Sequence, residues 1–137
     1  MSGDIGSPGE MATLAVGRQF PTDVIADESH IYWLEFSDGA IYRAEHDGSE
    51  PTLVFSGSYG GAVLVADDDS LYWTAGDSVW VSDKRGDDPR TIITGVERIH
   101  SLLLSDTDLY ISRAQADYSA PADGWILKVP KSSIAEL

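Results

Sequence analysis

The chain has 137 residues, 42% of them hydrophobic, with 23 acidic and 9 basic side chains and a formal net charge of −14. A surface this acidic repels phosphate backbones and anionic lipids, so nucleic acid and membrane surfaces are not expected as partners. The sequence has no cysteine, which excludes disulfides, thiolate metal sites and thiol nucleophiles.

Residues 1–10 are expected to form a flexible leader. They contain neither the basic stretch nor the apolar stretch of a signal peptide, and no apolar run approaches the roughly 20 residues that cross a bilayer. From the sequence as it stands we expect a cytoplasmic protein. Residues 11–16 then form a short apolar segment, predicted to be a strand that precedes the first repeat.

From about residue 18 the sequence repeats itself. An acidic turn is followed by an apolar residue, a tyrosine and a second apolar residue, and the three tyrosines, Tyr32, Tyr72 and Tyr110, are 40 and 38 residues apart. An independent marker, the glycine that ends a Thr-containing apolar run, has the same two spacings: Gly17, Gly57 and Gly95. Two signals in one register indicate a repeated structural unit.

Each repeat contains four short segments with strand character. The first is a continuous apolar run, typical of a strand buried on both faces: residues 23–26, 62–65 and 101–104. The second segments are residues 31–34, 71–74 and 109–112, and the third are 40–44, 78–82 and 125–129. A Thr-Leu-Val or Thr-Ile-Ile run is the fourth. Four strands in roughly 40 residues predict all-β propeller blades at about 18–57, 58–95 and 96–130. An antiparallel sandwich remains the alternative.

The segments Ile31–Leu34 and Leu71–Thr74, with the Gly39–Arg43 segment after the first, resemble the Tyr-Trp-Thr-Asp repeats of low-density-lipoprotein-receptor-type propellers. They are more similar still to bacterial propeller-repeat proteins. The resemblance covers about residues 11–130 and implies a six-bladed fold. It does not extend to the receptor family's ligand-binding details, because the aspartate expected after Tyr-Trp-Thr is Ala75 here.

The strands begin and end out of phase with the repeat. The chain opens with a fourth-type strand at residues 11–16 and ends after a third-type strand at Val129, so residues 11–137 correspond to half of a six-bladed ring. Three blades cannot close a ring, because closed propellers have about four to eight. We therefore predict a head-to-tail homodimer in which residues 11–16 supply the outer strand of the last blade. A fragment of a longer propeller is the alternative.

The predicted function is non-catalytic binding or scaffolding, with a protein, peptide or small molecule as ligand. Loops on a rigid scaffold often carry function. The face with the second-to-third-strand loops presents these candidates: Phe20, Phe36, Tyr59, Arg98 and Tyr118. The competing interpretation is that the rings among them pack between blades.

Metal binding is a weaker hypothesis, and no cofactor is expected. The long loop of the third repeat carries Asp117 and Asp123, whose oxygens could bind calcium, although they match no dense calcium motif. His100, just before an inner strand, could approach the central axis. The run Asp67–Asp69 occupies the acidic turn common to all repeats, so it predicts Asx-type hydrogen bonds to the backbone rather than a metal cluster.

No nucleophile elbow, phosphate loop or zinc-protease motif is present. The alternative function is a metal-dependent hydrolase or lactonase of the six-bladed propeller type. That activity would need acidic side chains at the axial ends of several inner strands; Asp23 fits this requirement and Ser101 does not. An inactive fragment of a longer propeller protein is a further alternative.

Overall fold

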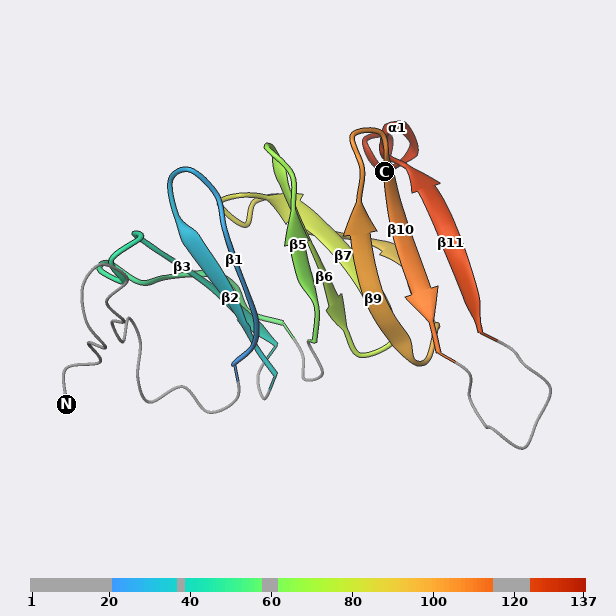
Figure 1. The fold of residues 1–137 in the computed structure, drawn as a ribbon, viewed down its shortest axis with the longest axis horizontal. Coiled ribbons are helices and arrows are strands. Elements are labelled where there is room, and N and C mark those ends of the chain that lie inside the picture. The colour runs from blue at the N-terminus through green and yellow to red at the C-terminus, as the bar shows by residue number, and fades with distance from the viewer. Residues whose placement is uncertain (1–20, 37–38, 58–61, 115–123) are drawn as a thin grey trace, which may run out of the picture.

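The computed structural model describes residues 21–36, 39–57, 62–114 and 124–137. Their strands form three antiparallel sheets, which lie side by side along the long axis of the molecule (Figure 1). The sheets correspond to the three predicted blades, and we call them blades 1, 2 and 3. The leader and the strand predicted at residues 11–16 lie outside the described residues.

Blade 1 has the strand order β1-β2-β3-β4: Pro21–Ala26, Ile31–Glu35, Ala40–Ala44 and Thr52–Phe55. Blade 2 has the order β5-β6-β7-β8: Leu64–Ala66, Ser70–Ala75, Ser78–Asp83 and Arg90–Ile93. Blade 3 has the order β9-β10-β11: Ile99–Leu104, Asp108–Arg113 and Trp125–Pro130. A short helix, α1 (Lys131–Ile134), follows.

The predicted turns have the backbone geometry that their residues favour. Gly48 and Gly86 follow the third strands of blades 1 and 2 with φ angles of 84° and 90°, a region that glycine enters at little cost. A Cβ on Gly86 would lie 2.0 Å from the carbonyl oxygen of Val54, a residue of β4. Glycine is therefore required at position 86 both by its φ angle and by the close approach of blade 1.

Consecutive blades pack face to face around their first strands, because β1 lies beside β5 and β5 lies beside β9. We call the face of a blade that points to the preceding blade its front face, and the opposite one its rear face. The rear face of blade 1 and the front face of blade 2 form one core cluster: Tyr32, Leu34, Ile41, Leu64, Leu71, Trp73 and Ala75. Blades 2 and 3 form the other: Tyr72, Val79, Val81, Leu102, Leu109, Ile111 and Ile134.

The first strands do not all have the burial that their apolar runs predict. In β5 Leu64 is buried, but Val24 of β1 is 64% exposed and Leu103 of β9 is 65% exposed. The prediction of a strand buried on both faces is therefore wrong for β1 and β9. The reason is positional, since blade 2 has a described blade on each side whereas blades 1 and 3 each have one.

Trp80 and Trp125 on third strands are partly buried and pack against the two core clusters.

No described helix is long and apolar enough to span a membrane.

Candidate functional site

The predicted loop face carries two kinds of loop. One kind connects second strands to third strands, and the other connects fourth strands to the first strand of the next blade. On it, Phe36 directly follows β2 and is half-buried. Arg98 directly precedes β9, is exposed, and has a φ of 61°. Its Nη1 lies 3.2 Å from Oε2 of Glu97, and its carbonyl accepts the N–H of Ala114 at 3.0 Å. Phe36 belongs to blade 1 and Arg98 to blade 3, so blade 2 separates them.

The other predicted ligand-binding residues, Phe20, Tyr59 and Tyr118, lie outside the described residues, as do the calcium candidates Asp117 and Asp123. His100 is exposed on β9. Within the described ranges, no group of three or more His, Asp or Glu side chains is arranged to hold a metal ion. Binding by these residues, and calcium binding, stay predictions.

A cavity of about 340 Å³ opens on the loop face between blades 2 and 3. Its lining carries both charge signs and one aromatic ring: Asp77, Gly95, Val96, Glu97, Arg113 and Trp125. Sequence reasoning missed Arg113 as a lining residue. Its position at the start of the long second-to-third-strand loop, on the predicted loop face, was the available signal.

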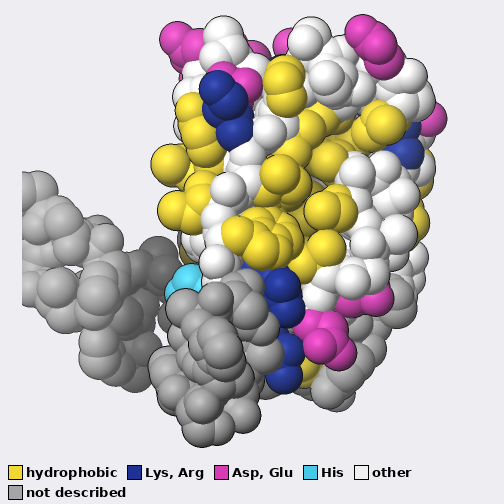
Figure 2. Space-filling model, turned by 90° about the vertical axis from the view of Figure 1, so that its right-hand side faces the viewer, with side chains coloured by type: hydrophobic (Ala, Val, Ile, Leu, Met, Phe, Trp, Pro, Cys, Tyr) yellow, Lys and Arg dark blue, Asp and Glu magenta, His cyan; other side chains and the backbone are white. Residues whose placement is uncertain are grey.

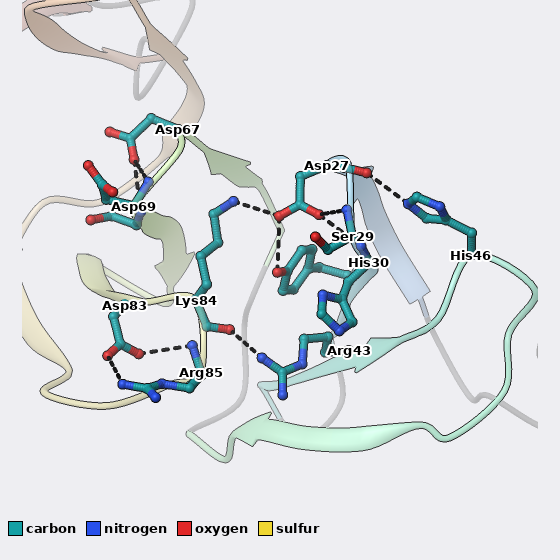
Figure 3. Close-up of polar contacts among 12 residues, drawn as sticks. Asp27, Ser29, His30, Arg43, His46, Asp67, Asp69, Asp83, Lys84 and Arg85 are labelled. Atoms are coloured by element: carbon teal, nitrogen blue, oxygen red, sulfur yellow. Dashed lines mark hydrogen bonds and ion pairs between the residues drawn. The ribbon is translucent and has the colours of Figure 1, made fainter.

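At the opposite end of the blades, the acidic turns carry the hydrogen bonds predicted for them. Oδ1 of Asp27 accepts the N–H groups of Ser29 and His30, both at 2.8 Å (Figure 3). Oδ2 accepts the hydroxyl of Tyr32 at 3.2 Å and Nζ of Lys84 at 2.7 Å. Lys84 follows the third strand of blade 2, so this contact joins two blades.

The same arrangement recurs one blade further on. Oδ1 of Asp67 accepts the N–H groups of Asp69 at 3.0 Å and Ser70 at 2.8 Å. Oδ2 accepts the hydroxyl of Tyr72 at 2.9 Å, and Nζ of Lys131 lies 3.1 Å from it. We call this unit of turn aspartate, tyrosine and lysine of the next blade the inter-blade clasp. Both lysine–aspartate pairs are largely shielded from solvent.

The clasps perturb the titration of their members. Burial by itself raises the pKa of Asp27, but the hydrogen bonds from Lys84 and from the turn N–H groups outweigh it and hold that pKa far below its usual range. For Asp67 the bonds from the turn, Lys131 and Tyr72 likewise overcome burial and lower the pKa. Burial, together with the charge of Asp27, raises the pKa of Tyr32 to about 12. The ionised aspartate paired with a neutral phenol is thus the stable form.

Cavities of about 550 and 500 Å³ lie beside the two clasps. Asp27 and Lys84 line the first, Asp67 and Lys131 the second. The polar groups of each clasp bond to one another, so the clasps connect neighbouring blades. Aspartate side chains line both cavities. Sequence reasoning identified the turns but missed both lysines. Both lysines stand two residues after a predicted third strand, and this shared position was the available signal.

The third turn differs, because Ser105 stands where blades 1 and 2 have aspartate. Its Oγ accepts the N–H groups of Thr107 at 3.3 Å and Asp108 at 3.0 Å, which preserves the turn without the charge. Its backbone bond to Asp108 also matches those of Asp27 and Asp67 in their turns.

Blade 3 exposes an apolar surface. Seen from that end of the molecule, hydrophobic side chains gather at the centre of the face, with charged side chains around them (Figure 2). Leu103 is 65% exposed and Ile126 77% exposed. In the strand register Leu103 pairs with Tyr110, and Tyr110 with Lys128, so these three residues form one row across the rear face of blade 3.

The sequence matches no protein-family model, and a search of curated proteins finds no similar sequence. The structure is similar to a chain in a crystal structure of a nidogen–laminin complex, a Tyr-Trp-Thr-Asp-type β-propeller. The TM-score is 0.70 at 19% identity, over 82% of this chain and 44% of that one. The chain is built of β-propeller blades.

A Saccharomyces cerevisiae complex of Dbp5 with Nup159, Gle1, IP6 and ADP contains a second similar chain. It has a TM-score of 0.55 at 14% identity, over 93% of this chain and 34% of its own length. This chain therefore spans less than half the length of either matched chain. At such identities the similarity establishes the fold, and the strand order above agrees with it.

Proposed function

We propose that the chain is a non-catalytic β-propeller binding module, and that two copies join head to tail to close a six-bladed ring. The observation that carries this proposal is the exposed rear face of blade 3. The rear row of each blade begins with a branched aliphatic side chain and a tyrosine, while its third member varies: Ile25, Tyr32 and Arg43; Val65, Tyr72 and Val81; Leu103, Tyr110 and Lys128. In blades 1 and 2 this row packs against the next blade.

The front face of blade 1 offers the surface that such a row needs. Its cross-strand row is Val24, Trp33, Tyr42 and Leu53. The corresponding row of blade 2, which includes Leu64, Trp73 and Trp80, packs on blade 1. Val24 and Leu53 are 64% and 51% exposed, whereas Trp33 in the same row is buried, so both ends of the chain present exposed apolar side chains.

Joining the two ends of different copies is a heterologous contact, and such contacts make rings when the rotation closes. Three blades per copy give six after one such pairing, within the size range of closed propellers. The resemblance to Tyr-Trp-Thr-Asp repeats favours that number. Burial of apolar area, at roughly 25 cal/mol per Å², must outweigh the repulsion between two acidic chains.

The proposed ligand is a protein, and the proposed contact surface is the loop face with its cavity lined by Arg113 and Trp125. Support comes from the similar propeller, which was solved in a complex of two proteins. A concave site with mixed charges and an aromatic ring suits recognition of polar protein segments, since aromatic and arginine side chains are enriched in interface cores.

The mass in solution, measured by light scattering during size exclusion, tests the ring. We expect a dimer for the full chain, and monomer or aggregate when residues 1–17 are removed. Leu103→Asp, which places a charge on the rear face of blade 3, should also give monomers. Leu137→Asp is the matched control, because Leu137 is similarly exposed at 58% but follows α1. A folded monomer for the full chain would overturn the proposal.

A further inference from the structure

The cation of the inter-blade clasp has an equivalent in blade 1. The registers pair Leu71 with Ser82 and Leu109 with Val129, and the clasp lysines follow two residues later at 84 and 131. In blade 1, Ile31 pairs with Ala44, so the equivalent position is 46. It holds a histidine. His46 is exposed, and its Nε2 lies 2.8 Å from the carbonyl oxygen of Asp27 in its own blade (Figure 3).

The anion of the clasp has an equivalent in blade 3. Asp27 and Asp67 begin their turns five residues before Tyr32 and Tyr72, and Ser105 stands five residues before Tyr110. The described residues contain no blade beyond blade 3 that could supply a lysine to Ser105, and none before blade 1 that could supply an aspartate to His46. The two members without a clasp partner thus lie at the two open ends of the blade row.

From the histidine at one open end and the serine at the other, we infer that a histidine–serine pair replaces the lysine–aspartate clasp at the seam between two copies. His46 of one copy lies against Ser105 of the other, at the position that a lysine–aspartate clasp occupies between blades of one chain. The inference rests on the proposed ring and names the residues that meet in it. In a two-fold ring the pair occurs twice.

At each open end of the blade row, charge complementarity favours the opposite end of a second copy over a blade that carries the clasp aspartate or the clasp lysine. An aspartate-bearing blade placed against His46 would lose the lysine that compensates its partly buried carboxylate. A lysine-bearing blade placed against Ser105 would likewise leave an ammonium group without its carboxylate. Partly buried charges without a partner are costly, whereas a serine hydroxyl and an imidazole can form a neutral hydrogen bond. Each end of the chain therefore fits the other end.

A second contact supports the same register. In blade 1, Nη1 of Arg43 donates to the carbonyl oxygen of Lys84 in blade 2, at 3.3 Å. Lys128 occupies the position of Arg43 in blade 3, because it pairs with Tyr110 as Arg43 pairs with Tyr32. Lys128 is exposed here, and across the seam it would face the backbone carbonyl of His46 of the other copy.

A double-mutant cycle on the full chain tests the pair. His46→Lys together with Ser105→Asp recreates the internal clasp at the seam. The dimer dissociation constant, measured by sedimentation for the wild type, both single variants and the double variant, should show a favourable coupling of about tenfold. The coupling should shrink as salt is added. The reversed pair, His46→Asp with Ser105→Lys, should give coupling of the same sign.

The matched control pairs His46→Lys with Thr107→Asp, which puts the same charge two residues further along the same exposed turn. A clearly smaller coupling there is expected. If the chain dimerises but position 105 couples no better than position 107 in both charge orders, the seam pair is wrong while the ring stands. If the wild type stays monomeric at all concentrations, the proposed ring fails and the seam fails with it.

Discussion

The two junctions between blades are built from the same backbone pattern but filled with different side chains. Between blades 1 and 2 the buried side chains are aromatic. The ring centroid of Phe55 lies 4.7 Å from that of Trp73 and 5.5 Å from that of Trp80. Between blades 2 and 3 the buried side chains are mostly aliphatic, and Ile111 stands at the position of Trp73. Both junctions keep the clasp.

This difference separates what is constant in the repeat from what varies. The strand pairing and the clasp recur, while the apolar filling changes from indole to branched aliphatic groups. Cores tolerate such exchange when the total volume is kept, because burial of apolar area is non-directional. The clasp depends on atoms at hydrogen-bond distance and tolerates less.

The largest expected effect is at the aromatic junction. Trp73→Ala should lower the free energy of unfolding by about 4 kcal/mol, and Ile111→Ala by about 3 kcal/mol, because the lost indole leaves the larger cavity. Urea unfolding at one fixed protein concentration measures both. A greater loss for Ile111→Ala would show that the aromatic junction is the weaker of the two.

Gly86 tests how closely the blades approach. Gly86→Ala should cost about 3 kcal/mol, since the new Cβ meets a carbonyl oxygen of β4 at a φ that L residues disfavour. Gly95→Ala is the control, because Gly95 has a φ of 77° but nothing within 4 Å of a new Cβ. There about 1 kcal/mol is expected. Equal losses, read from urea midpoints, would mean that blade 1 moves aside freely.

The clasps predict loss of stability in acid. The pKa values of Asp27 and Asp67 are lower in the folded protein than the ordinary 3.8, so folding favours their ionised forms. Their contribution is complete above about pH 5 and falls as the pH drops toward the folded-state values. Asp67→Asn should cost about 1–2 kcal/mol at neutral pH and flatten the acid limb of the stability curve.

The control for the acid effect is Asp106→Asn, in the exposed turn of blade 3 that has no clasp. It should leave the pH profile of unfolding unchanged. An unaltered acid limb in the Asp67→Asn variant would assign the acid sensitivity to other carboxylates.

The smallest expected effect concerns the clasp tyrosines. Tyr72→Phe removes the hydrogen bond to Asp67 and should cost about 1 kcal/mol. Tyr110→Phe alters the equivalent tyrosine of blade 3, five residues after Ser105, and should change the free energy of unfolding by less than about 0.5 kcal/mol. Thermal unfolding of the two variants under the same conditions measures this difference. Equal costs would indicate that the tyrosine hydroxyl stabilises the fold even without a carboxylate partner.

Much of the fold could be predicted because its signals are local. The spacing of the tyrosines and of the glycines located the second and third strands to within about one residue, and aspartate in a turn predicts its own Asx hydrogen bonds. The shared position of the clasp lysines, two residues after each predicted third strand, is visible in the sequence, but their role as clasp members is not. Lys84 and Lys131 follow their strands as ordinary surface residues would, and their partners lie in another blade.

The candidate site shows the same limit. Phe36 and Arg98 were predicted on one face from repeat position alone, which does not encode how far apart two blades place them. The cavity beside Arg113 depends on the packing of blade 3 on blade 2. Burial of β1 and β9 was overestimated for a related reason: an apolar run indicates that a strand can be covered, and its neighbour decides whether it is.

The inter-blade clasp also bears on how stability is distributed along the chain. Aspartate and tyrosine come from one sequence repeat and lysine from the next, so the energetic unit straddles the boundary between repeats. Stability then follows a nearest-neighbour sum in which each added blade contributes through the junction it completes. Blade 2 takes part in two junctions within the chain, so its amide hydrogens should be the last to exchange with solvent.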